Sequence, residues 1–362
     1  MNIPFVNLKS QYQTLKADID EAIQKVIDQT AFIKGPFVSE FESLFKSAYS
    51  VKHTISCANG TDAIYISLKA LGIGNGDEVI TTALSWISTS ETITQAGAKV
   101  VFVDISPDYY TIDTDKIEEK ITSRTKAIIP VHLYGQPAPM DQIMSIAKKY
   151  NLYVIEDCAQ AHFAKWKGQN VGTIGDIGTF SFFPGKNLGA YGDAGGIITN
   201  NDYTAEISRM YSNHGAIKKH HHDFEGINSR LDGIQAAVLS VKLPHIQDWN
   251  TLRRQHAKSY TSLLKNLQTP KINSKGTHVF HLYVIQHDDR DGLQDYLKKH
   301  GVATGIHYPT ALPFLKAYNY LGHSSADFPN AYRVQNRILS LPIYPELTIE
   351  EIEYIVDMIK SY

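Results

Sequence analysis

The chain has 362 residues and is 43% hydrophobic, so it is long enough to bury a large core in two domains or in one large domain with an appendage. Its formal net charge of -2 indicates neither a nucleic-acid-binding surface nor a polybasic membrane patch. The two cysteines, Cys57 and Cys158, are too few for a disulfide scaffold and too distant in sequence for a metal pair, which favours a reducing cytoplasm.

The first predicted elements are helices. Residues 1–5 lack the basic and apolar regions of a signal peptide, and no apolar stretch approaches membrane-spanning length, so we expect an unprocessed cytoplasmic protein. Apolar residues recur at helical spacing over residues 18–30 and again over residues 38–49. A third helix is expected over residues 61–70, directly after a turn that contains Gly60.

Short apolar runs then alternate with helical or turn segments. This alternation is typical of an α/β fold with a mainly parallel sheet and helices on both faces. From about Leu243 a long helical stretch begins, and a strand at 281–286 and a helix at 291–300 indicate a smaller α+β unit. We therefore predict a large domain over residues 1–245 and a small C-terminal domain over residues 246–362. The strands expected in the large domain are 78–81, 100–103, 127–131, 153–156, 179–183 and 196–199.

The turn Asn59-Gly60-Thr61-Asp62 has the features that a phosphate group requires. Glycine permits close approach, and the helix that follows directs its free amides outward. Taken alone, such a turn is more often an ordinary helix cap. The phosphate interpretation gains weight because other parts of a cofactor site are present further along the chain.

Lys186 is the most informative residue. It follows an apolar, β-prone segment and lies in a turn of small residues, where a lysine can act as a nucleophile on a carbonyl. The apolar run 152–155 reads as a buried strand that delivers Asp157 at its C-terminal end. A pyridoxal phosphate site requires such a pair, because the lysine forms the Schiff base and the acid keeps the pyridine nitrogen protonated.

Other nucleotide or metal patterns do not fit the sequence. Gly72, Gly74 and Gly76 lie between a helix and a strand, whereas dinucleotide-binding glycines follow a strand and open a helix. Asn187 stands where a Walker A loop needs Ser or Thr to bind magnesium. Three adjacent histidines at 220–222 lack chelate spacing, so we predict a solvated loop near the site mouth and no metal site.

Together these residues resemble the DegT/DnrJ/EryC1/StrS family of sugar aminotransferases, a branch of the fold-type I pyridoxal phosphate enzymes. The resemblance covers nearly the whole chain, from residues 35–38 near the start to residues 340–345 near the end. It implies an aminotransferase fold with a large, mainly parallel-sheet domain and a smaller C-terminal α+β domain. It also implies pyridoxal 5'-phosphate as cofactor and a nucleotide-linked sugar as substrate.

The resemblance assigns roles residue by residue. Lys186 would be the catalytic lysine that forms the Schiff base, Asp157 would bind the pyridine nitrogen, and Asn228 would reach the cofactor phosphate of a partner subunit. This last role implies a homodimer with shared active sites. The remaining cofactor contacts would be Gly60, Thr61, Trp86, Gln160 and Ser181, and the substrate contacts would be Arg230, His307, Tyr308 and His162.

Two departures from the family pattern bear on the substrate. Phe163 replaces the glycine that is usual after His162, and we expect it to form a bulkier wall at the pocket entry. The run from Gly185 to Gly196 resembles that of enzymes that aminate C-3 of the sugar. The predicted reaction converts a dTDP-3-keto-6-deoxyhexose to a dTDP-3-amino-3,6-dideoxyhexose with glutamate as amino donor. Such deoxysugar biosynthesis serves glycans of the lipopolysaccharide O-antigen or S-layer kind.

Several alternatives are left open by the sequence. Within the family, the substrate alternatives are amination at C-4 and a UDP-linked 3-keto sugar. A sugar dehydratase on the same fold would carry a histidine in place of Lys186, and a regulator that merely retains the fold would need an added DNA-binding segment. At single positions, Asp157 has the alternative role of a helix cap and Trp86 that of a core residue.

Overall fold

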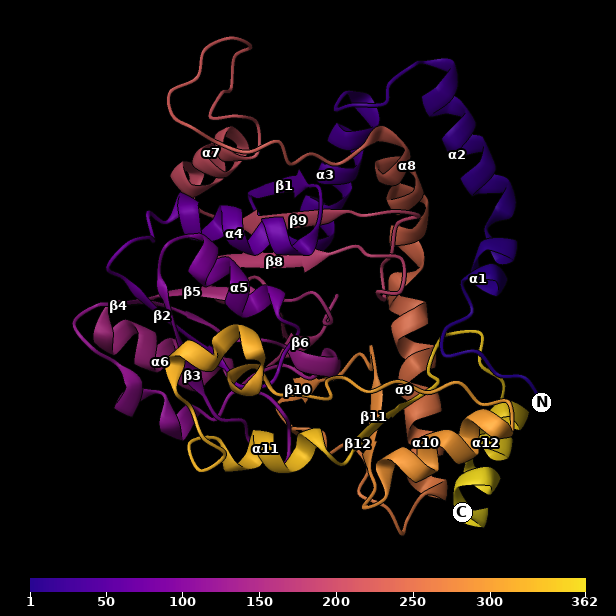
Figure 1. Ribbon diagram of the computed structural model, residues 1–362. Helices are drawn as coiled ribbons and strands as arrows, with labels where there is room; N and C mark the ends of the chain where they lie inside the picture. The colour runs from indigo at the N-terminus through magenta and orange to yellow at the C-terminus, as the bar shows by residue number, and fades with distance from the viewer.

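A seven-stranded sheet forms the centre of the computed structural model, which describes residues 1–362, and helices cover both of its faces (Figure 1). The strand order is β1-β9-β8-β5-β4-β2-β3, and β9 alone runs antiparallel to its neighbours. The predicted mainly parallel α/β sheet is confirmed. The strands are β1 His53–Cys57, β2 Glu78–Thr82, β3 Lys99–Val103, β4 Thr125–Ile129, β5 Tyr153–Asp157, β8 Ile177–Ser181 and β9 Gly195–Thr199.

Twelve α-helices and two small sheets complete the fold. The helices are α1 Leu8–Thr14, α2 Lys16–Asp28, α3 Pro36–Tyr49, α4 Gly60–Ala70, α5 Ser88–Gln95, α6 Met140–Tyr150, α7 Asp202–Tyr211, α8 Gly233–Lys242, α9 Ile246–Leu263, α10 Arg290–Lys299, α11 Pro329–Gln335 and α12 Ile349–Ser361. The short strands are β6 Lys165–Trp166, β7 Gln169–Asn170, β10 Gly276–Thr277, β11 Tyr283–Gln286 and β12 Ile338–Leu341. The 3-10 helices are η1 Thr114–Lys116, η2 Glu118–Lys120, η3 Leu133–Gly135, η4 Leu243–His245, η5 Leu312–Phe314 and η6 Lys316–Leu321.

The alternation of side chains along each strand builds a separate core on each face of the sheet. In β2, Val79 belongs to the same buried cluster as Ile66 of α4, whereas its neighbour Ile80 packs in a cluster with Met140 of α6. Beyond β8, α3 and α8 cover a third cluster that contains Phe180. The helices therefore pack on both faces of the sheet and hold in place the edge at which its parallel strands end.

Two element predictions need correction. The strand expected at 179–183 is β8, Ile177–Ser181, because Phe182 and Phe183 leave the sheet and only Phe182 stays buried. β1 was missed, since its polar Thr54 and Ser56 hide a strand whose pairing with β9 buries both of them.

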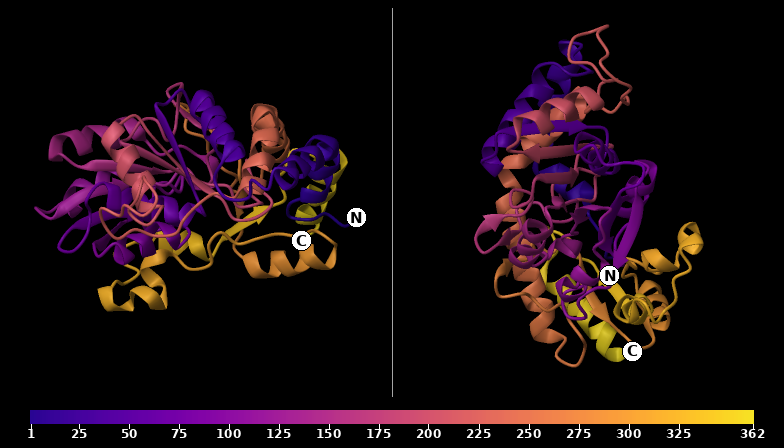
Figure 2. Two further views of the ribbon diagram at one scale, coloured as in Figure 1. Left: turned by 90° about the horizontal axis from the view of Figure 1, so that it is seen from above. Right: turned by 90° about the vertical axis from the view of Figure 1, so that its left-hand side faces the viewer.

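The division into domains at residue 245/246 stays a prediction. A fourth buried cluster contains apolar residues from α9, α10, α12 and the β11–β12 pair, and Ile3 from the N-terminus joins it. Figure 2 shows both termini at this end of the molecule. None of the helices combines the length and the apolar character needed to cross a membrane.

Candidate active site

The site lies where neighbouring parallel strands end. Because β5 and β8 are paired in parallel, Asp157 at the end of β5 and Ser181 at the end of β8 lie at the same edge of the sheet. The N-terminus of α4 meets this edge, since a Cβ added to Gly60 would lie 2.6 Å from the Cβ of Ser181. The structure thus brings Gly60, Ser181 and Asp157 together.

The first turn of α4 presents unpaired donors. The amides of Gly60 and Thr61 make no hydrogen bond within the chain, while Asn59 caps the helix by accepting from the amide of Asp62 at 2.8 Å. The hydroxyl of Thr61 lies 2.7 Å from that of Ser88. Free amides at a positive helix end, with hydroxyls beside them, are the donor set that a phosphate group requires, so these residues fit the phosphate of the cofactor.

Asp157 is buried and is held in place by two hydrogen bonds. The hydroxyl of Thr89 donates to its Oδ2 at 2.8 Å, and the amide of Ala159 donates to its Oδ1 at 3.1 Å. Thr89 in turn lies 2.9 Å from the hydroxyl of Ser85. These contacts orient the carboxylate at the strand end, which fits it to bind a protonated pyridine nitrogen. Thr89 was not predicted as a site residue.

Lys186 lies half-buried in the loop that follows β8. Its backbone amide donates to the carbonyl of Phe183 at 2.8 Å and closes a tight turn. Burial lowers the pKa of the Lys186 amine to about 8, against the opposing attraction of Asp157. Since a lysine with this pKa has a reactive neutral fraction near neutral pH, the amine is suited to attack a carbonyl and to carry protons.

The side chain of Gln160 bridges two parts of the site. Its Oε1 accepts from the amide of Tyr134 at 2.6 Å, and its Nε2 donates to the hydroxyl of Tyr308 at 3.0 Å. The ring of Tyr308 lies 5.6 Å from that of Trp86, centroid to centroid. Trp86 is 58% exposed, so the alternative of a core role for it is wrong. An exposed indole beside this edge is available to cover a bound ring.

The predicted histidines occupy different depths. His162 is fully buried between Phe180 and Phe182, with ring centroids 5.5 and 5.6 Å away, and neither of its ring nitrogens has a hydrogen-bond partner. Burial, reinforced by the charge of Lys186, lowers its pKa to about 3. His307 is half-buried, and the same two causes lower its pKa to about 4. Both imidazoles are therefore neutral near neutral pH.

Phe163 does not form the expected wall at the pocket entry. It is 5% exposed, and its ring packs 4.4 Å from that of Tyr49 on α3, centroid to centroid. Its backbone has a φ of 61°, and its amide donates to the hydroxyl of Tyr49 at 2.8 Å. The left-handed backbone thus turns the side chain into the core beneath α3, so the prediction from the sequence was wrong.

A polar network that the sequence did not reveal joins the loop of Lys186 to α9. Nδ2 of Asn187 donates to Asn250 at 2.8 Å and to the carbonyl of Val279 at 3.1 Å, while its Oδ1 pairs with Nδ1 of His281 at 3.1 Å. In this arrangement Nδ1 of His281 carries the hydrogen and Nε2 keeps a lone pair. Burial, and then the charge of Lys186, lower the pKa of His281 well below its ordinary value.

Asn228 and Arg230 lie on the segment between α7 and α8. Asn228 is exposed, and Arg230 lines a cavity of about 240 Å³ together with Lys34, Glu42 and Arg209. The intervening Ser229 is buried, and its hydroxyl donates to Asp62 at 2.7 Å, which anchors the segment to the first turn of α4. With a single chain described, the predicted contact with a partner subunit stays a prediction.

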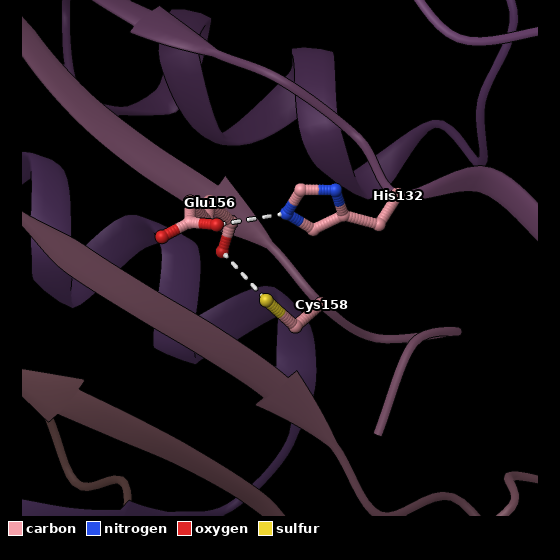
Figure 3. A group of neighbouring side chains, drawn as sticks. All are labelled: His132, Glu156 and Cys158. Atoms are coloured by element: carbon pink, nitrogen blue, oxygen red, sulfur yellow. Dashed lines mark hydrogen bonds and ion pairs between the residues drawn. The ribbon is translucent and has the colours of Figure 1, made fainter. Parts of the chain in front are cut away.

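One buried group has a metal-like composition, namely His132, Glu156 and Cys158 (Figure 3). Nδ1 of His132 accepts from the amide of Ala138 at 3.0 Å, so its Nε2 carries the hydrogen that is donated to Glu156 at 3.0 Å. The other oxygen of Glu156 accepts two backbone amides, at 2.8 and 2.7 Å. Because these nitrogen and oxygen atoms are already engaged in hydrogen bonds, the group stabilises the strand end beside Asp157.

The predicted solvated loop at 220–222 is exposed and projects after α7 (Figure 1).

The chain is similar to known proteins over nearly its whole length. A model of the DegT/DnrJ/EryC1/StrS aminotransferase family matches residues 13–360. The chain is 36% identical to DesV from S. venezuelae, whose crystal structure in complex with a ketimine intermediate superposes with a TM-score of 0.97 over 99% of this chain and 98% of that one.

Three curated relatives match over almost their whole length. The chain is 43% identical to the dTDP-3-amino-3,6-dideoxy-alpha-D-galactopyranose transaminase of Aneurinibacillus thermoaerophilus, covering 99% of both chains. It is 42% identical to the UDP-N-acetyl-3-dehydro-alpha-D-glucosamine 3-aminotransferase of Acidithiobacillus ferrooxidans, covering 99% of this chain and 97% of that one. It is 47% identical to a protein of Geobacillus stearothermophilus described as a pleiotropic regulatory protein, covering 100% of this chain and 99% of that one.

Proposed function

Because the chain belongs to the DegT/DnrJ/EryC1/StrS aminotransferase family and is a pyridoxal phosphate-dependent sugar aminotransferase, we propose that it aminates C-3 of a dTDP-linked 3-keto-6-deoxyhexose. The product is a dTDP-3-amino-3,6-dideoxyhexose, and glutamate is the amino donor. The meeting of Lys186, Asp157 and the free amides of Gly60 and Thr61 at one edge of the sheet supports the cofactor chemistry. The 43% identity to the dTDP-3-amino-3,6-dideoxy-alpha-D-galactopyranose transaminase of A. thermoaerophilus supports the choice of sugar.

The proposed cofactor seat uses residues of α4, α5, β5 and β8 together with the loops that contain Trp86 and Gln160. Gly60, Thr61 and Ser181 hold the phosphate, and Asp157, oriented by Thr89, holds the proton of the pyridine nitrogen. Trp86 covers the ring, and Gln160 donates to the ring hydroxyl. In the structure Nε2 of Gln160 donates one of its two hydrogens to the hydroxyl of Tyr308 at 3.0 Å, which leaves the second for the ring hydroxyl. When bound, the cofactor supplies an electron sink for transamination.

Lys186 performs the proton transfers in this proposal. Its amine would hold the carbonyl group of the cofactor, and the free amine would take the proton from the α carbon of glutamate. In the second half-reaction the same amine returns a proton to C-3 of the sugar. Burial, which brings the lysine pKa to about 8, keeps a neutral fraction available for both steps.

The substrate residues of the proposal frame the same opening. His307 and Tyr308 contact the nucleotide sugar from the C-terminal part of the chain, and His162 shapes the floor from behind the strand end. Asn228 and Arg230 complete the site of a partner subunit in a cytoplasmic homodimer, in which each chain has domains at residues 1–245 and 246–362. The free, exposed side chain of Asn228 supports this arrangement.

A UDP-linked 3-keto sugar is the second candidate substrate, because the relative from A. ferrooxidans that acts on a UDP-linked sugar is as similar as the dTDP-sugar transaminase. The two are separated by incubating the purified enzyme with cofactor, glutamate and a panel of dTDP- and UDP-linked 3-keto and 4-keto sugars. Formation of 2-oxoglutarate is followed in each reaction. We expect the highest kcat/KM with the dTDP-3-keto-6-deoxyhexose, whereas a preference for a UDP-linked or a 4-keto sugar would contradict the proposed substrate.

A further inference from the structure

Lys242, at the end of α8, is a lysine that the proposed chemistry does not use. Its side chain is fully buried, although a buried ammonium is costly unless it is paired. Its Nζ donates to the carbonyl of Gly189 at 2.7 Å and lies 4.2 Å from the centre of the Tyr191 ring. No carboxylate lies within ion-pair distance of it, and burial lowers its pKa to about 8 against the opposing attraction of Glu346. The cation is therefore held by one carbonyl and one aromatic face.

Both partners of Lys242 belong to the loop that carries Lys186. This loop is tightly folded, since a Cβ on Gly189 would lie 2.3 Å from the carbonyl oxygen of Pro184. A shift of the backbone at Gly189 therefore also moves the turn in which the amide of Lys186 donates to the carbonyl of Phe183.

Two further anchors join the loop to the same helical run. Oε1 of Gln235 in α8 accepts from the amide of Tyr191 at 2.8 Å, and Oδ1 of Asn250 in α9 accepts from Asn187 at 2.8 Å. Gln235, Lys242 and Asn250 thus bond to the loop from successive positions along the continuous run of α8, η4 and α9. Figure 1 shows α8 and α9 as one column beside the end of β8.

We propose that Lys242 is a positioning residue, which holds the loop of Lys186 so that the catalytic amine meets the carbonyl of the incoming cofactor. This inference rests on the proposed role of Lys186. The ammonium reaches the loop at its middle anchor, between the contacts made by Gln235 and Asn250. Loss of this anchor releases the loop while leaving the phosphate seat on α4 and the carboxylate of Asp157 intact.

The test compares Lys242→Met with Lys242→Arg and with Lys258→Met, a matched change at an exposed lysine of α9. Apo enzyme is mixed with pyridoxal phosphate, and the rate of capture by Lys186 is followed by absorbance. The affinity for pyridoxamine phosphate, which forms no bond to Lys186, is measured in parallel. Amide hydrogen exchange of residues 183–191 reports the loop without any cofactor.

We expect Lys242→Met to slow capture about tenfold or more, because a displaced amine loses the geometry of attack. Affinity for pyridoxamine phosphate should stay within about twofold, and exchange at Lys186 and Ala190 should be faster. Lys242→Arg should recover part of the capture rate, and Lys258→Met should match the parent. If Lys242→Met does not fold, Lys242→Gln takes its place in the same comparison.

Unchanged capture with unchanged exchange in the loop would overturn the inference. Equal losses of affinity for both forms of the cofactor would also overturn it, because they would indicate a general structural role. A failure of the proposed function is distinguishable from these outcomes, since the parent protein itself would then capture no pyridoxal phosphate.

Discussion

Lys186 owes its chemistry to its surroundings at the end of β8. An exposed lysine has an ordinary pKa of 10.5, and burial brings that of Lys186 to about 8, because the charged form loses hydration that Asp157 only partly replaces. The neutral amine, which is the nucleophile, thus accumulates at a lower pH than in an exposed lysine.

The pH dependence of cofactor capture follows from this shift. We expect the rate at which the apo enzyme captures pyridoxal phosphate to rise with pH through about 8 and to level off about one unit above it, since the amine is half deprotonated at its pKa and almost fully deprotonated one unit higher. Stopped-flow absorbance from about pH 7 to about pH 10 measures the profile. A rate that continues to climb through about pH 10 would show that Lys186 titrates like an exposed lysine.

Asp157 is expected to matter through its charge. Asp157→Asn keeps the shape of the side chain but cannot hold the pyridine proton, so kcat should fall about 100-fold or more, a loss of about 2.7 kcal/mol in transition-state stabilisation. Thr89→Val leaves the carboxylate in place but removes its hydrogen bond from Thr89 at 2.8 Å, together with the contact of Thr89 with the Ser85 hydroxyl at 2.9 Å, and should cost about tenfold or less. Single-turnover kinetics with glutamate compare the two variants, and a kcat for Asp157→Asn within about tenfold of the parent would refute the assignment.

At the scale of elements, the first turn of α4 depends on the absence of a side chain at Gly60. A Cβ there would meet Ser181 at 2.6 Å and push the strand end away from the phosphate seat. We expect Gly60→Ala to raise the dissociation constant for pyridoxal phosphate about tenfold or more. Gly74→Ala is the control, because its Cβ would lie 3.4 Å from the nearest atom, an ordinary contact. Equal affinity in the two variants, measured by fluorescence titration, would argue against a phosphate seat at Gly60.

The sequence predicts the elements that carry a strong local pattern. The helices near residues 18–30 and 38–49 appear as α2 and α3 within a few residues, because their apolar spacing is decisive on its own. β1 has no such pattern, and only its pairing with β9 explains why its Thr and Ser side chains are buried. Short polar strands therefore escape a reading based on periodicity.

The parts of the site that depend on distant contacts were also beyond the sequence. Thr89 in α5 meets Asp157 at the end of β5, 68 residues further along the chain, and His132 meets Glu156 from the loop after the neighbouring strand β4. Lys242 looks like an ordinary basic residue in the last turn of a helix, and only the fold shows that it is buried against Gly189. Lys186 and Asp157 could be predicted from the sequence, because a lysine and a carboxylate at strand ends have a chemistry that is unusual there.

At the scale of the whole molecule, the proposed homodimer makes a prediction about mixed subunits. Lys186→Ala should abolish activity in its own site, and a double variant of Asn228→Ala and Arg230→Ala should impair the site of its partner. By two-fold symmetry, a mixed dimer then carries both lesions in one site and none in the other. We expect mixing of the two inactive proteins to restore activity.

Native mass spectrometry confirms subunit exchange in that experiment, and a mixture of each variant with itself is the control. Exchanged subunits without recovered activity would place Asn228 and Arg230 in the site of their own chain, or outside any site.

The most direct measurement of the whole account is the transfer of ¹⁵N from labelled glutamate to the sugar. The enzyme is incubated with pyridoxal phosphate, [¹⁵N]glutamate and the dTDP-3-keto-6-deoxyhexose, and the product is examined by NMR. We expect ¹⁵N bonded to C-3 of the dTDP-linked sugar, together with an equal amount of 2-oxoglutarate. Absence of ¹⁵N from every nucleotide sugar tested, in a protein that has bound its cofactor, would contradict the proposed function.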